Sequence, residues 1–315
     1  MSGPTACGKT KTSLRLAGKL KKETKKSVAI VNFDSLLFYK ELNIGTAKPL
    51  LSEREEVPHY MVDVCSINKP MNASLFADEA RKLINNLHKN ETIPILVGGS
   101  GFYLRALLKG MYQCPSLPEN LKIENQKLFK KEGITPFLNL LKKVDHKSYV
   151  NLHPNDTYRI MRAFEFYQVT KKPISEEKER LDSQDPYDFS KIEHLNWDIY
   201  QTYLNLPKSD HQQIIENRTQ KMIEDGLVEE VKELLDKGAT GIEKPLLSIG
   251  YKETIQLLQG KFDNQKAYQE RINISTRQLA KAQRTFFKKV QHKNTFNPLH
   301  EMELAVDQMV QFTLR

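Results

Sequence analysis

In the first hundred residues, short apolar runs typical of buried strands alternate with segments whose apolar positions have a helical period. Short apolar runs at Ser27–Asn32 and Thr92–Val97 predict buried strands. Between residues 11 and 22, by contrast, the apolar side chains of Leu14, Leu16, Ala17 and Leu20 recur at helical spacing. Strands alternating with helices predict a parallel α/β sheet, in which ligands bind at the carboxyl ends of the strands.

The pattern changes after Gly110. Residues 113 to about 181 are polar, rich in lysine and helical in period, with prolines as interruptions, so we expect a helical insertion. The run Asn196–Leu204 predicts a strand that returns to the sheet, followed by a long helix capped by Ser209, interrupted at Gly226 and ended at Gly238. We therefore expect a core of residues 1–112 and 191–315, with 113–190 inserted.

A second helix with a distinctive charge pattern is predicted between Arg271 and Lys293. This stretch holds seven Lys or Arg residues and no Asp or Glu. Four of the basic residues share one stripe, and Ile272, Leu279, Phe286 and Val290 lie on the opposite one. Solvated helix faces usually mix charges, so an unbroken basic stripe favours contact with a phosphate backbone. The predicted contact residues are Arg277, Lys281, Arg284 and Lys288.

Composition and charge limit the class of protein. The chain has 315 residues, 39% of them hydrophobic and 28% charged, with a net charge of +9. These values are typical of a globular protein, and the positive charge is compatible with a polyanionic partner. No apolar run is long enough to suggest a membrane span, and Cys7, Cys65 and Cys114 indicate neither a disulfide framework nor a zinc site. We expect a cytoplasmic protein that does not bind membranes.

The most specific motif is the phosphate-binding loop at residues 3–10, of the form G-x-x-x-x-G-K-[ST]. Its backbone amides, its lysine and its final hydroxyl form a cradle for a diphosphate and Mg²⁺. The predicted loop residues are Gly3, Pro4, Thr5, Ala6, Cys7, Gly8, Lys9 and Thr10. A strand normally precedes such a loop. Met1 and Ser2 are too few to form one, so we expect the first strand to be missing from this chain.

Three further features have more than one interpretation. Asp34, just after the first predicted strand, is placed as a catalytic carboxylate, but it could equally cap a helix or bind Mg²⁺. The glycine-rich segment 98–101 could approach a ligand or simply form a tight turn. Arg159 and Arg162 lie one helical turn apart, a spacing at which salt bridges on a surface helix are common.

Together these segments resemble the bacterial tRNA dimethylallyltransferase family, also called tRNA isopentenyltransferases. The blocks that carry the resemblance occur in the family's order along nearly the whole chain: Asp34–Tyr39, Asn43–Pro49, Pro58–Tyr60, Gly98–Tyr103, His153–Asp156 with Arg159 and Arg162, Ile249–Lys252, and Arg277–Lys281 with Gln283 and Thr285. Leu37 stands where many members have Gln, and Ser100 replaces the usual Thr.

The resemblance implies an activity and roles for residues. The family transfers a dimethylallyl group from dimethylallyl diphosphate to N6 of the adenine on the 3′ side of the anticodon. By resemblance, Asp34 is the base, Thr5, Lys9 and Arg218 contact the diphosphate, and Thr10 holds Mg²⁺. Each role suits the chemistry, since charge develops on the leaving diphosphate and the amine loses a proton.

The same resemblance implies a partner, the anticodon stem-loop of tRNA, which the helical insertion would grip, and we expect the enzyme to be a monomer. A target base must leave its stack to reach a buried diphosphate. The implied tRNA contacts, besides the basic helix, are Asp34, Ser35, Leu36, Leu37, Ser100, Lys122, Tyr158, Arg159, Ile160, Met161, Arg162, Leu247, Ser248, Ile249, Gly250, Tyr251 and Lys252.

Three rival functions remain open from the sequence. A small-molecule kinase would use the same loop to bind ATP. An adenylate isopentenyltransferase would modify free AMP, although a free nucleotide needs no extended basic surface. A non-catalytic RNA-binding protein could keep the fold without the chemistry, although the loop lysine and Asp34 are both present.

Overall fold

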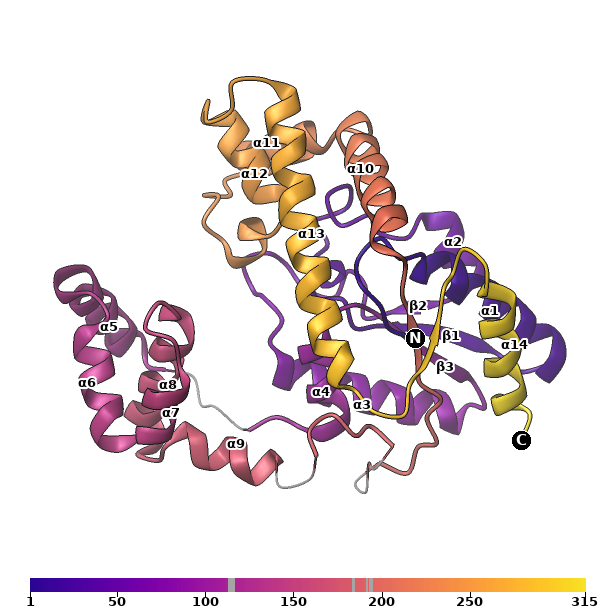
Figure 1. Ribbon diagram of the computed structural model, residues 1–315, viewed down its shortest axis with the longest axis horizontal. Coiled ribbons are helices and arrows are strands. Elements are labelled where there is room, and N and C mark those ends of the chain that lie inside the picture. Colours follow the sequence, from indigo (N-terminus) through magenta and orange to yellow (C-terminus); the bar gives the residue numbers. More distant parts are fainter. Residues whose placement is uncertain (113–116, 183–184, 191, 193–194) are drawn as a thin grey trace. The chain divides into compact units, whose positions relative to one another are not determined.

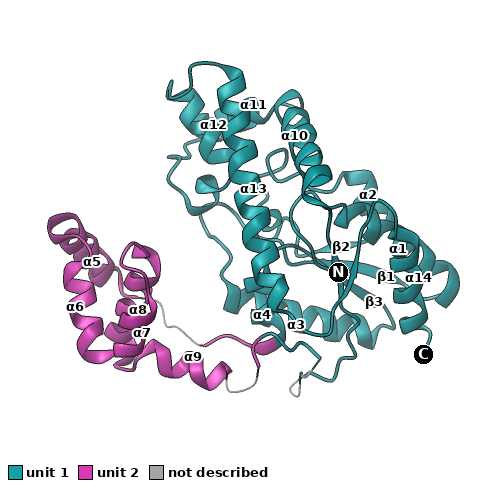
Figure 2. Ribbon diagram, in the orientation of Figure 1, with its two compact units in different colours: residues 1–108, 187–315 teal, residues 109–186 magenta. Residues whose placement is uncertain are grey.

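The computed structural model describes residues 1–112, 117–182, 185–190, 192 and 195–315. The chain forms two compact units (Figure 2). Unit 1 comprises residues 1–108 and 187–315, and unit 2 comprises residues 109–186. The insertion therefore begins and ends about four residues earlier than the sequence pattern predicts. Cys114 lies outside the described residues, and Cys7 and Cys65 are free thiols.

The predicted parallel sheet is present at the centre of unit 1 (Figure 1). Strand β1 (Val28–Asn32) lies between β2 (His59–Tyr60) and β3 (Ile93–Val97), and both pairings are parallel. Strands β4 (Thr202–Leu204) and β5 (Asn294–Phe296) form a second parallel pair. Ser2 forms isolated parallel bridges to both Gly98 and Tyr203, and so connects the two sets of strands.

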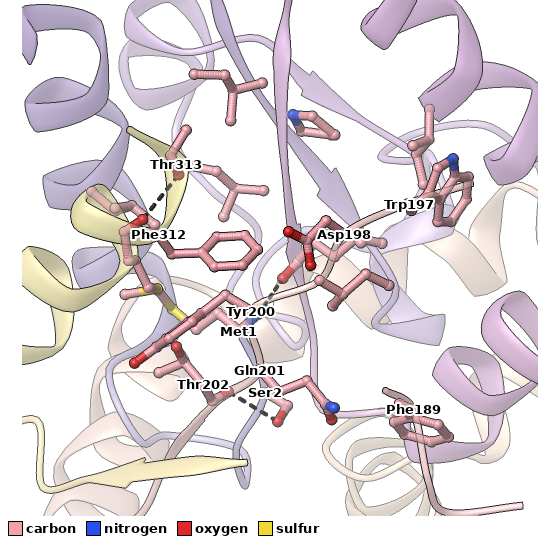
Figure 3. A pocket seen from close by; sticks show the side chains of 18 of the residues that line it. Met1, Ser2, Phe189, Trp197, Asp198, Tyr200, Gln201, Thr202, Phe312 and Thr313 are labelled. Atoms are coloured by element: carbon pink, nitrogen blue, oxygen red, sulfur yellow. Dashed lines mark hydrogen bonds between the residues drawn. The ribbon is translucent and has the colours of Figure 1, made fainter. Parts of the chain in front are cut away.

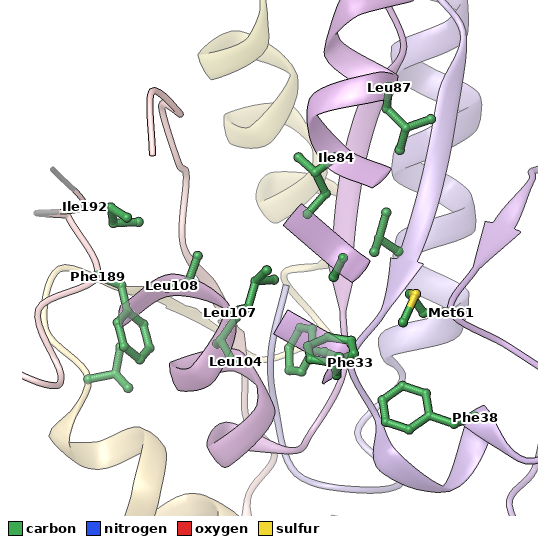
Figure 4. Packing of buried hydrophobic residues seen from close by; sticks show 14 of the residues in the cluster. Phe33, Phe38, Met61, Ile84, Leu87, Leu104, Leu107, Leu108, Phe189 and Ile192 are labelled. Carbon is green, nitrogen blue, oxygen red and sulfur yellow. The ribbon is translucent and has the colours of Figure 1, made fainter. Parts of the chain in front are cut away.

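Helices cover both faces of this sheet. On one face, α1 (Lys9–Thr24) packs beside α14 (Met302–Thr313) (Figure 1). The other face is covered by α3 (Ala73–Lys89), α4 (Gly101–Lys109) and the carboxyl end of α13 (Gln265–Lys289). Figure 4 shows the apolar cluster on this second face, which includes Phe33, Phe38 and Leu104. Strand β1, which is apolar except for Asn32, is completely buried because both faces of the sheet are covered.

The remaining elements of unit 1 form a helical layer with its own core around Tyr251, Tyr268 and Leu246. Its helices are α10 (Lys208–Glu224), α11 (Leu227–Asp236), α12 (Tyr251–Leu258) and the amino-terminal half of α13. Short elements complete the unit: the 3₁₀ turns η1 (Ser35–Phe38) and η2 (Lys244–Leu247) and the helix α2 (Leu51–Glu56).

The elements that the structure describes in unit 2 are all helices, as the polar, helical period of its sequence predicts. A small core around Phe137, Leu141 and Phe164 holds it together. Its helices are α5 (Glu119–Glu132), α6 (Thr135–Val144), α7 (His146–Asn151), α8 (Thr157–Thr170) and α9 (Ile174–Asp182). No helix among the described residues has both the length and the apolar character needed to cross a membrane.

Local boundaries differ from the sequence predictions in three places. The return strand is only three residues long, because residues 196–201 are not paired as a strand. Ser209 is not the helix cap: Pro207 occupies that position, and the helix begins at Lys208. The basic helix begins earlier than expected, at Gln265, where the side chain of Asn264 accepts a hydrogen bond from the amide of Ala267. Gly226 and Gly238 interrupt and end the preceding helices as predicted, both with positive φ.

Candidate functional site

The phosphate-binding loop has the context that its motif requires, because a helix starts at its lysine. Gly8 precedes α1 with φ 84°, and no side chain caps the first turn of this helix. Those amide groups are therefore available to an anion, which the helix dipole also favours. Gly3 is confined as well. A Cβ there would lie 2.5 Å from the carbonyl oxygen of Leu204 and 2.6 Å from the Cys7 sulfur.

Lys9 folds back over the loop. Its Nζ donates hydrogen bonds to the carbonyl oxygens of Gly3 at 3.1 Å and Pro4 at 2.8 Å. The ammonium group is thus held at the cradle, where a bound diphosphate would offer it stronger, charged acceptors.

Thr5 is held at three of its atoms by side chains from α10 and α13. Its amide donates to Oε1 of Gln283 at 2.7 Å, and its carbonyl oxygen lies 2.7 Å from Nε2 of His211. Its hydroxyl accepts a hydrogen bond from Nη1 of Arg218 at 3.1 Å. Gln283 also donates from Nε2 to the carbonyl oxygen of Gly99 at 3.1 Å. Two distant helices therefore fix the position of the loop.

The protonation of His211 follows from its partners. Nη2 of Arg284 lies 2.6 Å from Nδ1 of His211, and a guanidinium can only donate, so Nδ1 is the acceptor and Nε2 carries the proton given to Thr5. Burial lowers the pKa of His211 below its ordinary value, and the charges of Arg284, Lys9 and Arg218 lower it further. The imidazole is therefore neutral when it holds the loop.

Sequence reasoning missed His211. One signal was available: His211 and Arg218 are seven residues apart, which places them on the same face of a helix. From the sequence, Gln283 was noticeable only as one residue of a segment that resembles the family. Its contact with Thr5 spans 278 positions and cannot be read from local pattern.

Asp34 lies at the carboxyl end of β1, as predicted. Its side chain accepts a hydrogen bond from the Leu36 amide at 3.4 Å and so caps η1, which bears out one of its alternative roles. The amide of the adjacent Ser35 donates to Oγ of Ser100 at 3.3 Å. The ends of β1 and β3 are thereby joined, and residues 34–37 and Ser100 belong to one site.

Arg218 links the phosphate-binding loop to the segment around Thr46. Besides Thr5, its guanidinium donates to the carbonyl oxygen of Thr46 at 3.3 Å. Burial lowers the pKa of Arg218, and the charge of Asp34 opposes that effect. Arg218, the predicted diphosphate contact, thus lies against the phosphate-binding loop, and the charge of Asp34 acts on its guanidinium.

A metal ion at this site would depend on the loop itself. Within the described ranges, no group of three or more His, Cys, Asp and Glu side chains could hold a metal ion. Thr10 in the first turn of α1 offers a hydroxyl, an oxygen ligand of the kind that Mg²⁺ accepts together with phosphate oxygens. The donor set therefore fits a cation that arrives with its diphosphate.

The loop at residues 43–45 is held by Glu230 of α11. Its carboxylate accepts hydrogen bonds from the amides of Asn43 and Ile44, each at 2.9 Å, and from the Tyr251 hydroxyl at 2.6 Å. Gly45 packs against the Tyr251 ring so closely that a Cβ would lie 2.6 Å from it. This arrangement positions Thr46, whose carbonyl oxygen contacts Arg218.

Several residues predicted to contact tRNA are turned inward. Tyr251 and Ile160 are fully buried, and Gly250 is buried as well. In unit 1, Leu247 and Lys252 are exposed, whereas Ser248 and Ile249 are half-buried.

The predicted contacts in unit 2 lie on two helices. On α8, Tyr158 is exposed, Met161 is half-buried, and Arg159 and Arg162 form ion pairs with Asp156 and Glu165. On α5, Lys122 pairs with Glu119.

The four residues of the basic stripe have different surroundings. Lys281 and Lys288 are exposed on α13. Arg277 pairs with Glu270 at 2.6 Å. Arg284 instead points inward, to His211 and to Oδ1 of Asn205 at 3.1 Å. The opposite stripe is mostly covered, although Leu279 is 38% exposed.

The chain is similar to proteins of one family. Residues 37–290 match the model of the IPP transferase family. The tRNA dimethylallyltransferase 2 of Syntrophus aciditrophicus is 34% identical over 96% of this chain and 92% of its own length. The tRNA dimethylallyltransferase of Dictyoglomus turgidum is 37% identical over 94% of this chain and 85% of its own length.

Solved structures agree with these relatives. The full-length tRNA isopentenylpyrophosphate transferase of Bacillus halodurans superposes with a TM-score of 0.68 at 26% identity, covering 99% of this chain and 94% of that chain. A eukaryotic dimethylallyltransferase acting on tRNA gives a TM-score of 0.77 at 25% identity, covering 98% and 76%.

Proposed function

Because this chain belongs to the IPP transferase family, we propose that it transfers a dimethylallyl group from dimethylallyl diphosphate to N6 of the adenine 3′ to the tRNA anticodon. The observation that carries the proposal is the position of Arg218. Its guanidinium donates a hydrogen bond to the Thr5 hydroxyl of the phosphate-binding loop, and the charge of Asp34 opposes the lowering of its pKa by burial. The same site can therefore bind the leaving diphosphate and supply a base for the incoming amine.

The first half of the reaction breaks the bond between C1 of the dimethylallyl group and the diphosphate oxygen. Negative charge then collects on the diphosphate. The amides of α1's first turn and Arg218 can stabilise that charge, since the contacts around Thr5 already position the loop and the guanidinium. Lys9 can add its charge by turning from the carbonyl oxygens of Gly3 and Pro4 to the diphosphate. Mg²⁺ bound by Thr10 and the phosphate oxygens would supply additional positive charge.

The second half forms the bond between N6 and C1. An exocyclic adenine amine is a weak nucleophile that becomes acidic as it is alkylated, and it must lose one proton. Asp34 orients the amine by accepting its hydrogen bond and then takes that proton. Diphosphate leaves with the electron pair of the broken bond, so the atoms and charges balance.

Binding of tRNA is supported by charge and exposure. Lys281 and Lys288 on α13, together with the exposed Tyr158 and the basic residues of α8, offer phosphate contacts and an aromatic surface. We propose that the enzyme works as a monomer and, since tRNA is its substrate, in the cytoplasm.

A mass-spectrometric assay separates this function from its rivals. The protein is incubated with Mg²⁺, dimethylallyl diphosphate and unmodified tRNA, and the anticodon-loop fragment is examined for one added five-carbon group. A parallel reaction offers AMP instead of tRNA, and a third offers ATP. Modified AMP with unmodified tRNA would support the adenylate transferase, and ATP turnover alone would support a kinase. The proposal stands only if the tRNA fragment gains the group.

A further inference from the structure

The three side chains that hold Thr5 act on different groups of this residue. Gln283 accepts a hydrogen bond from the Thr5 amide, which belongs to the preceding peptide group, and Arg218 contacts the hydroxyl. His211, in contrast, donates from Nε2 to the Thr5 carbonyl oxygen at 2.7 Å. That oxygen belongs to the peptide group between Thr5 and Ala6. His211 therefore acts on the next peptide group of the loop.

The bond to this carbonyl oxygen also sets the direction of the Ala6 amide. A trans peptide group is planar, and its C=O and N–H point in opposite directions. Because the Thr5 carbonyl oxygen points toward His211 on α10, the Ala6 N–H points away from α10. This N–H has no acceptor among the residues that the structure describes. It is therefore available to an anion bound in the loop.

Ala6 has a backbone conformation that depends on its surroundings. Its φ is 59°, in the left-handed region, and Gly8, two residues later, has a φ of 84°. Left-handed residues in such a turn direct successive N–H groups to one point and form an anion-binding nest. Glycine adopts a positive φ readily, whereas an alanine keeps one only where neighbouring groups hold it. His211 holds the peptide group that leads into Ala6.

Arg284 fixes the form of His211 that can donate this bond. Its guanidinium donates to Nδ1 of His211 at 2.6 Å, and it is anchored by Oδ1 of Asn205 at 3.1 Å and the carbonyl oxygen of Leu206 at 3.4 Å. Because Nδ1 accepts, the proton of the neutral imidazole lies on Nε2. In the other tautomer, the lone pair of Nε2 would face the Thr5 carbonyl oxygen, and the bond would be lost.

The backbone that leads into the loop borders a cavity. Met1 and Ser2 line this cavity, which has a volume of about 470 Å³ (Figure 3). A cavity offers no packing contacts to the backbone beside it. Packing on this side of the loop is therefore incomplete, and the side chains of α10 and α13 become more important for the position of the loop.

We propose that Arg284 and His211 are positioning residues for the diphosphate. Arg284 selects the Nε2–H tautomer of His211, and the imidazole holds the peptide group between Thr5 and Ala6 so that the Ala6 amide is directed to the diphosphate before it binds. The inference rests on the proposed function in that the ligand of the loop is a diphosphate. A cradle that is already formed loses less conformational freedom on binding, and its affinity is higher for that reason.

Calorimetry with Mg²⁺ and inorganic diphosphate tests the proposal without tRNA or group transfer. His211→Leu removes the donor without changing the charge, and we expect it to weaken diphosphate binding about tenfold. His211→Gln offers an amide donor to the Thr5 oxygen and should recover most of the affinity. Arg284→Met should weaken binding about as much, whereas Arg284→Lys keeps a donor for Nδ1 and should recover most of it. Arg271→Met, which removes an exposed arginine from the same helix, is the control.

The imidazole nitrogens of His211 give a second readout, which a loss of charge or of packing alone would not change. NMR of the protein with nitrogen-labelled histidine at pH 8 should show one protonated nitrogen, Nε2, and one unprotonated acceptor, Nδ1. Arg284→Met should convert this spectrum to that of two exchanging tautomers, and Arg284→Lys should preserve it. The measurement on the unaltered protein does not depend on the folding of any variant.

A proton on Nδ1 of His211, or a mixture of tautomers in the unaltered protein, would overturn the proposal. Diphosphate binding by His211→Leu that equals that of Arg271→Met would overturn it as well. If Arg284→Met weakens binding without changing the tautomer, the guanidinium acts only through its charge, and the role proposed for Arg284 is wrong.

The same measurements separate this inference from the proposed function. If diphosphate binding shows the expected differences but tRNA remains unmodified, the positioning role is supported and the proposed function is contradicted. If the unaltered protein does not bind diphosphate, both are contradicted.

Discussion

Oε1 of Gln283 accepts a hydrogen bond from the amide of Thr5 at 2.7 Å, and the same side chain donates to the carbonyl oxygen of Gly99 at 3.1 Å. The side-chain amide of Gln283, on α13, thus links the phosphate-binding loop to the glycine turn after β3. Gly99 permits this approach, because a Cβ there would lie 2.5 Å from Nε2 of Gln283. Gly99 thus permits close packing of a side chain from α13, which is neither of the two alternatives that the sequence left open.

Replacing Gln283 by Ala should loosen the loop. The change leaves the Thr5 amide and the Gly99 carbonyl without their partner, so we expect the free energy of unfolding to fall by about 1–3 kcal/mol. Affinity for dimethylallyl diphosphate, measured by calorimetry, should fall as well. The control is Gln278→Ala, an exposed position on the same helix. Equal behaviour of the two variants would contradict a role for Gln283 in positioning.

The neutral His211 should make stability depend on pH. Its pKa is lowered in the folded protein, so the unfolded chain binds a proton first as the pH falls below the ordinary value of 6.5. Stability is therefore complete above pH 6.5 and decreases below it. In His211→Gln, which offers a donor and an acceptor but does not titrate, thermal unfolding between pH 7 and 5 should show a weaker pH dependence. The exposed His292→Gln serves as control, and a pH profile of His211→Gln identical to the wild type would argue against this assignment.

The proposed base is tested by Asp34→Asn. The amide keeps an oxygen that can cap η1 but cannot take the proton, so we expect the transfer rate to fall by about 10²–10⁴-fold. Binding of tRNA, followed by filter retention, should change less than threefold, and Tm should be retained. A variant that keeps most of the transfer rate would rule out Asp34 as the base, and parallel loss of binding and rate would point to a role in folding.

Glu230 is expected to be a major support of the active-site loop. Its carboxylate accepts hydrogen bonds from two loop amides and from the buried Tyr251 hydroxyl. Glu230→Ala leaves these donors without a partner, so the free energy of unfolding should fall by about 2–4 kcal/mol in denaturant titrations. Glu229→Ala, at the exposed neighbouring position of α11, should have a much smaller effect. Comparable losses in both variants would indicate only a general effect of charge at this helix terminus.

We expect the exposed and the inward-pointing basic residues of α13 to have different functions. Lys281 and Lys288 are exposed, so replacing both by Gln should weaken tRNA binding and reduce its salt dependence by about one unit of slope for each lost phosphate contact. Arg284→Gln should instead impair diphosphate affinity through His211. Lys22→Gln/Lys25→Gln removes the same charge elsewhere on unit 1. If that control lowers the salt slope equally, the effect comes from net charge and not from α13.

Short-range pattern determined a large part of this protein. Strands β1 and β3, the helix that begins at Lys9 and the helical insertion all follow from local periodicity, because hydrophobic spacing and the glycine and lysine of the loop act within a few residues. Burial was predicted correctly for β1, whereas three of the five residues of β3 are only half-buried. The family was also visible from ordered motifs. Backbone boundaries such as the cap at Pro207 were less well predicted, since a cap depends on geometry that several residue types can supply.

Only the tertiary structure decided which side chains hold the loop. His211, Gln283 and Arg284 lie more than 200 residues from Thr5 in sequence. His211 and Gln283 contact Thr5 and Arg284 contacts His211, because α10 and α13 pack side by side. The structure also showed that Arg284 points inward, to His211 and Asn205. Such contacts depend on how whole elements pack, and a one-dimensional pattern records which face of an element is apolar but not which partner that face will meet.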